Sequence, residues 1–178
     1  MLTEEKINQL LSELNQRLHK EQIVGEVYLV GGAVMCLVYH ARPATKDVDG
    51  YFLPKEKLRE CAAKIAEAHD LPENWLNDAA KGYLSNNLSN NGKFNTWLEL
   101  ENLKVFVPAP EYLLALKCLA MRIGLEFHDE EDIRFLLRYL NIEKYEEAVK
   151  IIKEFYPIEK FPQKTLYALE EILNDKPK

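Results

Sequence analysis

The sequence predicts an α+β fold, in which a small mixed sheet flanked by helices precedes a C-terminal helical bundle. Short apolar segments with strand character alternate with amphipathic helical segments over residues 1–108, whereas residues 109–178 show helical periodicity alone. The chain has 178 residues and 47% hydrophobic content, which suffices for one well-formed core. We therefore expect an α/β core over residues 1–108 and a helical part over residues 109–178 that packs on it as one compact unit.

The elements of the first part follow from capping residues and from apolar spacing. Thr3 is placed to cap a helix that runs to about residue 20, because its hydroxyl can accept a bond from an unpaired N–H of the first turn. The apolar stripe of this helix comprises Ile7, Leu10, Leu11, Leu14 and Leu18. The next elements expected are a buried strand at residues 27–30, a helix at 33–39, a second strand at 48–53 and a helix at 55–69.

The later elements follow from alternation and composition. Residues 97–100 and 103–107 alternate in side-chain character, which predicts a hairpin that turns at Glu101 and Asn102. The Asn-rich segment 86–92 has the composition of a loop, and we expect it to border the substrate site. The rest of the chain is predicted to be helical, over residues 112–121, from residue 129 onward, over 143–154 and over 163–173.

Composition and charge narrow the classes of function. The net charge of −6 argues against an extended DNA-binding surface, although contact with one end of an RNA stays compatible with it. Cys36, Cys61 and Cys118 lie in apolar helical contexts without disulfide or zinc spacing, so we expect them to be buried. The chain shows no signal-peptide pattern and no apolar run long enough to span a membrane, so we expect a soluble, cytoplasmic protein.

Two short motifs lie on the first strand, helix and strand. Gly31 and Gly32 follow the first strand, and Asp47 and Asp49 lie where the second strand begins. Residues two apart in a strand share a face, and two carboxylates on one face raise each other's pKa unless a cation lies between them. Magnesium, or manganese, is a hard ion suited to such oxygens, and glycine lets a phosphate approach the backbone closely.

Each motif alone has a structural explanation, as a tight strand-to-helix turn or as a solvated strand face. Their combination on adjacent elements favours a site for a metal-bound triphosphate. Arg42, Thr45 and Lys46 lie in the loop before the second strand, where substrate would enter. Arg42 or Lys46 could contact the triphosphate, or both could be solvated loop cations.

With these motifs the chain resembles the DNA polymerase beta-type nucleotidyltransferases, and within them the abortive-infection group. That group is AbiEii-like and includes the MenT-type toxins of type IV toxin–antitoxin systems. The superfamily signature is a Gly-Gly or Gly-Ser pair followed, after a variable helix, by Asp-x-Asp. A later helix that carries Lys117 and Arg122 and is followed by Asp129-x-x-Asp132 resembles further motifs of the group, so the similarity spans about residues 28 to 140.

The resemblance implies a function and a set of partners. A nucleoside monophosphate would pass from a nucleoside triphosphate to an acceptor hydroxyl, either at the 3′ end of a transfer RNA or on a protein. A cognate antitoxin is an implied partner. The alternative is a non-catalytic protein of the same fold, with a binding or antitoxin-like regulatory function.

The resemblance also implies a third carboxylate on a strand beside the Asp-x-Asp strand. Glu99 is the candidate and Glu101 the reserve, although the superfamily usually has an Asp here. A charged side chain on the wet face of a hairpin is the other explanation for Glu99.

Lys117 carries the one charge of an otherwise apolar helical segment, and a buried ammonium needs an anion. Its partner is either the nucleotide phosphates or an internal aspartate such as Asp132. Asp129 is expected to cap the next helix. Arg122 would lie about 140° around the helix from Lys117, so the two should have separate partners.

The candidate residues divide into three overlapping sets. The catalytic candidates are Asp47, Asp49, Glu99, Lys117 and Asp132. The nucleotide-binding candidates are Gly31, Gly32, Arg42, Lys46 and Lys117. The metal ligands would be Asp47, Asp49 and Glu99.

Overall fold

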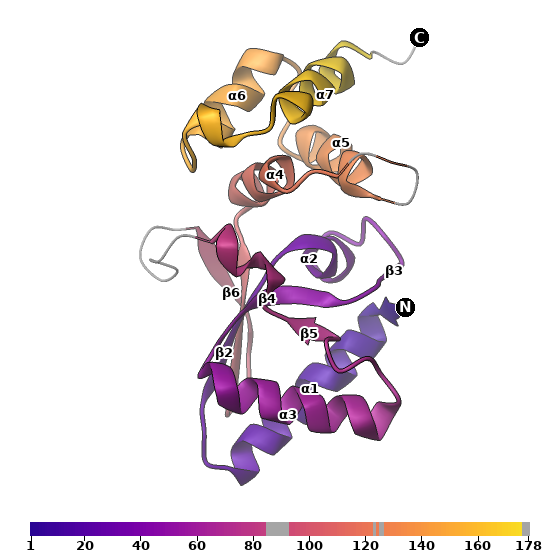
Figure 1. Cartoon of the computed structure of the whole chain (residues 1–178), viewed down its shortest axis with the longest axis vertical. Coiled ribbons are helices and arrows are strands. Elements are labelled where there is room, and N and C mark those ends of the chain that lie inside the picture. Colours follow the sequence, from indigo (N-terminus) through magenta and orange to yellow (C-terminus); the bar gives the residue numbers. More distant parts are fainter. Residues whose placement is uncertain (85–92, 123, 125–126, 176–178) are drawn as a thin grey trace. The chain divides into compact units, whose positions relative to one another are not determined.

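The computed structural model describes residues 1–84, 93–122, 124 and 127–175. The chain forms two compact units, Met1–Pro108 and Ala109–Lys178. The first is mixed α and β and the second is helical, so the predicted α+β class is confirmed (Figure 1). The segment 86–92, which we expected to be a loop, lies outside the described residues.

A five-stranded mixed sheet forms the framework of the first unit. The strands run in the order β5-β4-β2-β7-β6, so the first long strand, β2, lies in the centre. β2 is antiparallel to β4 and parallel to β7, β4 is parallel to β5, and β6 and β7 form the predicted hairpin. The strands are β2 (Gly25–Leu29), β4 (Val48–Leu53), β5 (Leu76–Asn77), β6 (Phe94–Glu99) and β7 (Leu103–Pro108).

One face of this sheet is covered by two helices. α1 (Glu4–Lys20) and α3 (Lys55–His69) contact each other, α1 also contacts β7, and α3 contacts β4. The predicted cap of α1 is confirmed, because Thr3 Oγ1 accepts a bond from Lys6 N at 3.3 Å. The side chains buried on this face of the strands include Val27, Leu29, Val48, Phe52 and Val105.

Asn102 fastens the hairpin turn to α1 and to the chain that follows it. Its backbone N–H donates to Asn15 Oδ1 at 2.8 Å, and its Nδ2 donates to the carbonyl of Ile23 at 2.9 Å. Its carbonyl accepts a bond from Gly25 N at 2.8 Å. The buried amide thus has partners for its polar groups, as burial requires.

α2 (Gly31–Leu37) connects β2 to the loop before β4 and contacts β4. It begins two residues earlier than the segment 33–39 that the sequence predicted. A short antiparallel pair, β1 (Leu2–Thr3) and β3 (Ala44–Thr45), lies beside it (Figure 1). The loop that carries Thr45 is therefore held to the start of the chain.

In its described residues the second unit has four α-helices, and the central one, α4, is packed against the other three. α4 contacts each of the other three, as expected for a segment that is apolar on nearly every side. Tyr112 on α4 lies 3.1 Å, oxygen to oxygen, from Tyr156, and both are buried. The helices are α4 (Pro110–Leu119), α5 (Asp129–Tyr139), α6 (Tyr145–Lys153) and α7 (Gln163–Asn174). Across the part of the chain that the structure describes, no helix is long and apolar enough to cross a membrane.

Candidate functional site

Gly31 lies at the junction of β2 and α2 with a φ of +66°, a conformation that glycine adopts without strain. A Cβ at this position would lie 3.2 Å from Asp49 Oδ2, so a carboxylate is packed against the glycine. Val30 N donates to the carbonyl of Asp49 at 2.9 Å and ties the junction to β4. Both the backbone conformation and the approach of Asp49 therefore require glycine here.

Gly32 shows the same close approach from the loop before β4. A Cβ on this buried residue would lie 2.6 Å from Thr45 Oγ1 and 2.9 Å from a terminal guanidinium nitrogen of Arg42. The sequence predicted Gly31, Gly32, Arg42 and Asp49 as site residues but gave Thr45 no role. We call these five residues the glycine–aspartate site.

The strand β4 presents Asp49 on the face of the sheet opposite α1 and α3. Val48 and Phe52 are buried against the helices, whereas Asp49 and Tyr51 between them are half-buried. Asp47 lies at a bend one residue before β4 begins and is also half-buried, and Lys46 is exposed. Position 50 of β4 has no room for a side chain, because a Cβ on Gly50 would lie 2.6 Å from the carbonyl oxygen of Tyr28.

Glu99 lies at the opposite end of the sheet from Asp49. In the register Glu99 pairs with Lys104, Lys104 with Glu26, and Glu26 with Leu53, which follows Asp49 by four residues. Three strand spacings across and four residues along place the two carboxylates about 20 Å apart. The prediction that Glu99 binds the same ion as Asp47 and Asp49 is therefore wrong.

The surroundings of Glu99 agree with this correction. Its carboxylate is 62% exposed and lies 3.0 Å from Lys104 Nζ, an ordinary surface ion pair. The reserve residue Glu101 lies in the same hairpin turn, so it too is excluded as the third ligand. The strand order that puts β6 at the edge decides this outcome.

Asp47, Asp49 and the neighbouring Thr45 hydroxyl offer oxygen ligands of the kind that magnesium and manganese prefer. Within the described residues, no group of three or more His, Cys, Asp and Glu side chains is placed to hold a metal ion. Two carboxylates and a hydroxyl would fit a hard ion if phosphate oxygens and water supplied its remaining ligands, as is usual for magnesium.

The second unit contains a cluster of four charged residues, in which Lys117, Asp129 and Asp132 are buried and Arg122 is exposed. We call it the Lys117 cluster. Lys117, only 7% exposed, has its Nζ 3.1 Å from Asp129 Oδ1 and 2.6 Å from Asp132 Oδ2. Of the two partners that the sequence left open for Lys117, the structure contains the internal aspartate. A role of Lys117 in phosphate binding, and of Asp132 in catalysis, stays a prediction.

The cluster corrects two expectations. α4 ends at Leu119, so Arg122 is not part of that helix, and its backbone N and Nε both donate to Asp129 Oδ2 at 3.1 Å. Lys117 and Arg122 thus share Asp129 as a partner. The expectation of separate partners assumed that both residues lie on one helix, and α4 ends before Arg122. Asp129 is the first residue of α5 and does not cap it; its carboxylate accepts the bonds from these two cations.

The electrostatics of Asp129 follow from this arrangement. Burial alone would raise its pKa, but the charge of Lys117 and the hydrogen bonds from Arg122 and Lys117 outweigh burial and lower the pKa below its usual value. The formal charges of the cluster cancel: the buried Lys117 offsets one buried carboxylate, and the exposed Arg122 offsets the other.

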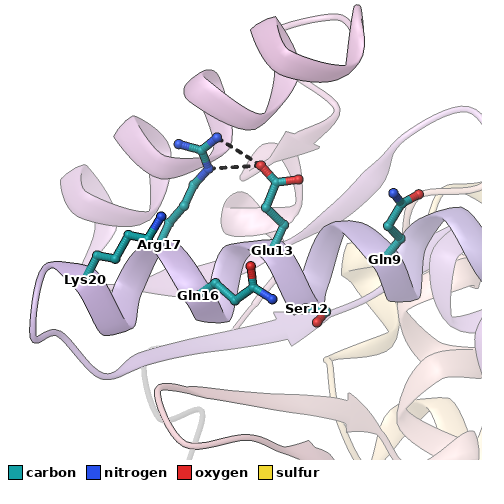
Figure 2. Close-up of a pocket in the computed structure, with 6 residues that line it drawn as sticks. All are labelled: Gln9, Ser12, Glu13, Gln16, Arg17 and Lys20. Carbon is teal, nitrogen blue, oxygen red and sulfur yellow. Dashed lines mark hydrogen bonds and ion pairs between the residues drawn. The ribbon is translucent and has the colours of Figure 1, made fainter.

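A hollow on α1 lies apart from all the predicted site residues. It has a volume of about 400 Å³ and is lined by Gln9, Ser12, Glu13, Gln16, Arg17 and Lys20, all from one face of α1 (Figure 2). Glu13 within it accepts bonds from Arg17 at 2.9 and 3.2 Å.

Glu13 also joins α1 to α3. Lys6 Nζ donates to His69 Nδ1 at 2.9 Å, so His69 Nε2 carries the proton that Glu13 Oε2 accepts at 2.6 Å. The bond from His69, more than the nearby charges, lowers the pKa of Glu13. The network thus ties Glu13 to Arg17 within α1 and to His69 on α3.

Comparisons with protein-family models, with curated proteins and with solved structures found no match to this chain.

Proposed function

We propose that the protein is a metal-dependent nucleotidyltransferase that transfers a nucleoside monophosphate from a nucleoside triphosphate to an acceptor hydroxyl. The observation that carries the proposal is the packing of Asp49 against Gly31, with Thr45 and Arg42 against Gly32. Carboxylate and hydroxyl oxygens suit a hard cation, and a guanidinium suits phosphate. The turn at Gly31 and Gly32 thus lies beside groups suited to both the metal ion and the phosphates of a metal-bound triphosphate.

Each group has a task in this proposal. Asp47 and Asp49 hold magnesium or manganese, and Arg42 and Lys46 contact the phosphates. The two glycines let phosphate oxygens come close to the backbone because no side chain intervenes. When bound, the ion neutralises the negative charge of the phosphates and of the departing pyrophosphate.

The reaction is an in-line displacement at phosphorus. The acceptor oxygen forms a bond to the α-phosphorus while the bond from that phosphorus to the bridging oxygen of the β-phosphate breaks. Pyrophosphate leaves, and the hydroxyl proton passes to water. The choice of a transfer RNA 3′ end or a protein as acceptor, and membership of a toxin–antitoxin pair, rest on the family resemblance alone.

A second candidate function is nucleotide binding without catalysis, as in a regulatory protein of the same fold. The observation that favours it is the position of Glu99, which leaves Asp47 and Asp49 without the third carboxylate that the resemblance implies. Both candidate functions include triphosphate binding at this site, but only the first includes transfer of the nucleoside monophosphate.

The test is transfer of label from each of four α-labelled nucleoside triphosphates, with magnesium, total transfer RNA and cell protein. Transfer should occur with the unmodified chain and with Glu99→Gln, and should be lost in an Asp47→Ala/Asp49→Ala double variant. Magnesium-dependent binding of triphosphate without transfer supports the second candidate. Absence of binding by the folded, unmodified chain contradicts both.

A further inference from the structure

We propose that a row of aromatic side chains beside Asp49 binds a nucleobase by stacking. The inference rests on the proposed function, because Asp49 would hold the phosphate end of the same ligand. The row consists of Tyr51 on β4, Tyr28 on β2 and Phe106 on β7, and we call it the aromatic row.

The three rings lie side by side across three neighbouring strands. Tyr28 pairs with Tyr51 on one side and with Phe106 on the other in the strand register. The Tyr28 ring lies 4.6 Å, centroid to centroid, from Phe106 in a stacked arrangement and 6.5 Å from Tyr51 in a tilted one. Phe94, which pairs with Pro108 in the row of Asp49, makes an edge contact with Tyr28 at 5.2 Å.

The aromatic row is the next row of side chains after Asp49 on the same face of the sheet. Asp49 and Tyr51 are two residues apart on β4 and are both half-buried, about 6.6 Å along the strand. In a nucleotide one sugar ring separates the base from its α-phosphate. A phosphate at Asp49 therefore places the attached base over Tyr51.

The row beyond the aromatic one holds Leu53 on β4 and charged residues on the next three strands. These are Glu26 on β2, Lys104 on β7 and Glu99 on β6, and Lys104 lies 3.0 Å from Glu99. A flat ring on Tyr51 thus has the phosphate site on one side, and on the other the exposed Leu53 with Glu26 on the neighbouring strand. The apolar side chain can contact the ring, and the carboxylate can accept a bond from the edge of a base.

The three aromatic residues differ in what they can do. Tyr28 is 4% exposed and its hydroxyl donates to Glu26 Oε2 at 2.9 Å; burial and this bond raise its pKa to about 12. Tyr28 therefore supports its neighbours. Tyr51 and Phe106 are half-buried and keep exposed surface, and Tyr51 is the nearer to Asp49. Tyr51 is the residue that we expect to contact the base.

The base can belong to the incoming nucleoside triphosphate or to the end of an RNA acceptor. Stacking on an aromatic side chain suits either source, because every base has a flat face. The experiment measures magnesium-dependent binding of three probes to the full chain: inorganic tripolyphosphate, each nucleoside triphosphate, and a short single-stranded RNA with a free 3′ hydroxyl. The variants are Tyr51→Leu and, as the matched control, Tyr51→Phe.

We expect Tyr51→Leu to weaken binding of the nucleoside triphosphate about tenfold or more, with tripolyphosphate binding unchanged and Tyr51→Phe close to the parent. Unchanged tripolyphosphate binding also shows that the variant is folded. A loss confined to RNA assigns the base to the acceptor. Equal affinities of Tyr51→Leu and the parent for every base-containing probe overturn the inference but leave the proposed function intact. If the parent binds none of the probes, the proposed function fails and this inference with it.

Discussion

The glycine–aspartate site and the Lys117 cluster look alike in the sequence but differ in the structure. Both combine acidic and basic residues at short spacing, and both led us to the resemblance to nucleotidyltransferases. In the Lys117 cluster, Lys117 and the two aspartates are buried and the charges neutralise one another. At the glycine–aspartate site the acidic and basic side chains are half-buried and surround backbone without side chains. The two regions therefore differ in burial more than in charge pattern, and this difference is the reason that we propose the glycine–aspartate site as the ligand site.

The largest difference should appear when one lysine is removed from each region. Lys117→Met leaves two buried carboxylates without their ammonium, and breaking such a pair costs about 3–5 kcal/mol. Lys46→Met removes an exposed cation from the loop of the other region and should change the free energy of unfolding by less than about 0.5 kcal/mol. Urea unfolding of both variants at neutral pH measures the contrast.

Acid should act on Lys117→Met in a characteristic direction. Without the Lys117 ammonium, Asp132 and Asp129, which keeps its bonds from Arg122, should have higher folded pKa values than in the parent, so the variant should regain part of the lost stability as pH falls toward 5. Equal stabilities of Lys117→Met and Lys46→Met would show that the cluster contributes nothing to the fold.

Gly31→Ala is expected to have an intermediate effect on stability and a large one on binding. A non-glycine residue in the left-handed conformation costs about 1–2 kcal/mol, and the added Cβ lies 3.2 Å from Asp49 Oδ2. Displacing that carboxylate should weaken magnesium-dependent triphosphate binding more than tenfold.

A matched control for Gly31→Ala is Gly82→Ala, because Gly82 has no atoms within 4 Å of an added Cβ. Calorimetric titration of both variants with tripolyphosphate makes the comparison. If Gly31→Ala bound tripolyphosphate as tightly as the parent, Gly31 would not be part of the triphosphate site.

The pH dependence of the Lys117 cluster can be followed through Asp129. Its folded pKa lies below the unfolded value, so its ionised form contributes stability above the ordinary carboxyl pKa of 3.8, and this is lost as pH falls through the folded pKa. Asp129→Asn lacks this contribution. The gap in stability between the parent and Asp129→Asn, measured by urea unfolding from pH 7 down to pH 3, should narrow at the acid end. A constant gap would mean that Asp129 acts through packing alone.

The smallest effect is expected from Glu99→Gln. Its ion pair with Lys104 is more than half exposed on the side of Glu99, and such pairs contribute less than about 0.5 kcal/mol. Tripolyphosphate binding should also be unchanged, since Glu99 lies at the far end of the sheet. If tripolyphosphate binding by this variant no longer depended on magnesium, Glu99 would be a ligand of the metal ion, and the strand register would be contradicted.

The elements that local signals define were predictable from the sequence. β4 and α3 have the predicted bounds, because alternation and an apolar stripe end clearly at Pro54 and His69. The end of α4 was not predictable, since the apolar pattern continues to Met121, which is buried without being helical. The spacing of apolar residues indicates which positions are buried, and in this segment buried positions continue past the last turn of α4.

The candidate site divides in the same way. Gly31, Gly32 and Asp49 were identified because they flank one short helix, so their proximity follows from local chain geometry. The position of Glu99 depends on β7 lying beside β2 and β6 at the edge, which pairs residues far apart in the chain. The spacing of residues within the hairpin does not indicate the order of the strands in the sheet.

Gly50 has a consequence for how tolerance to substitution should be understood in this chain. No side chain fits between β4 and the backbone of Tyr28, so any selection that requires only a folded protein should retain this glycine. Asp47 is half-buried at a bend before β4, and the packing of the sheet does not require an aspartate there. A mutational scan scored for abundance should therefore preserve Gly50 and let Asp47 vary, and only a scan scored for activity should preserve both. The difference between the two scans would separate what this segment needs to fold from what it needs to work.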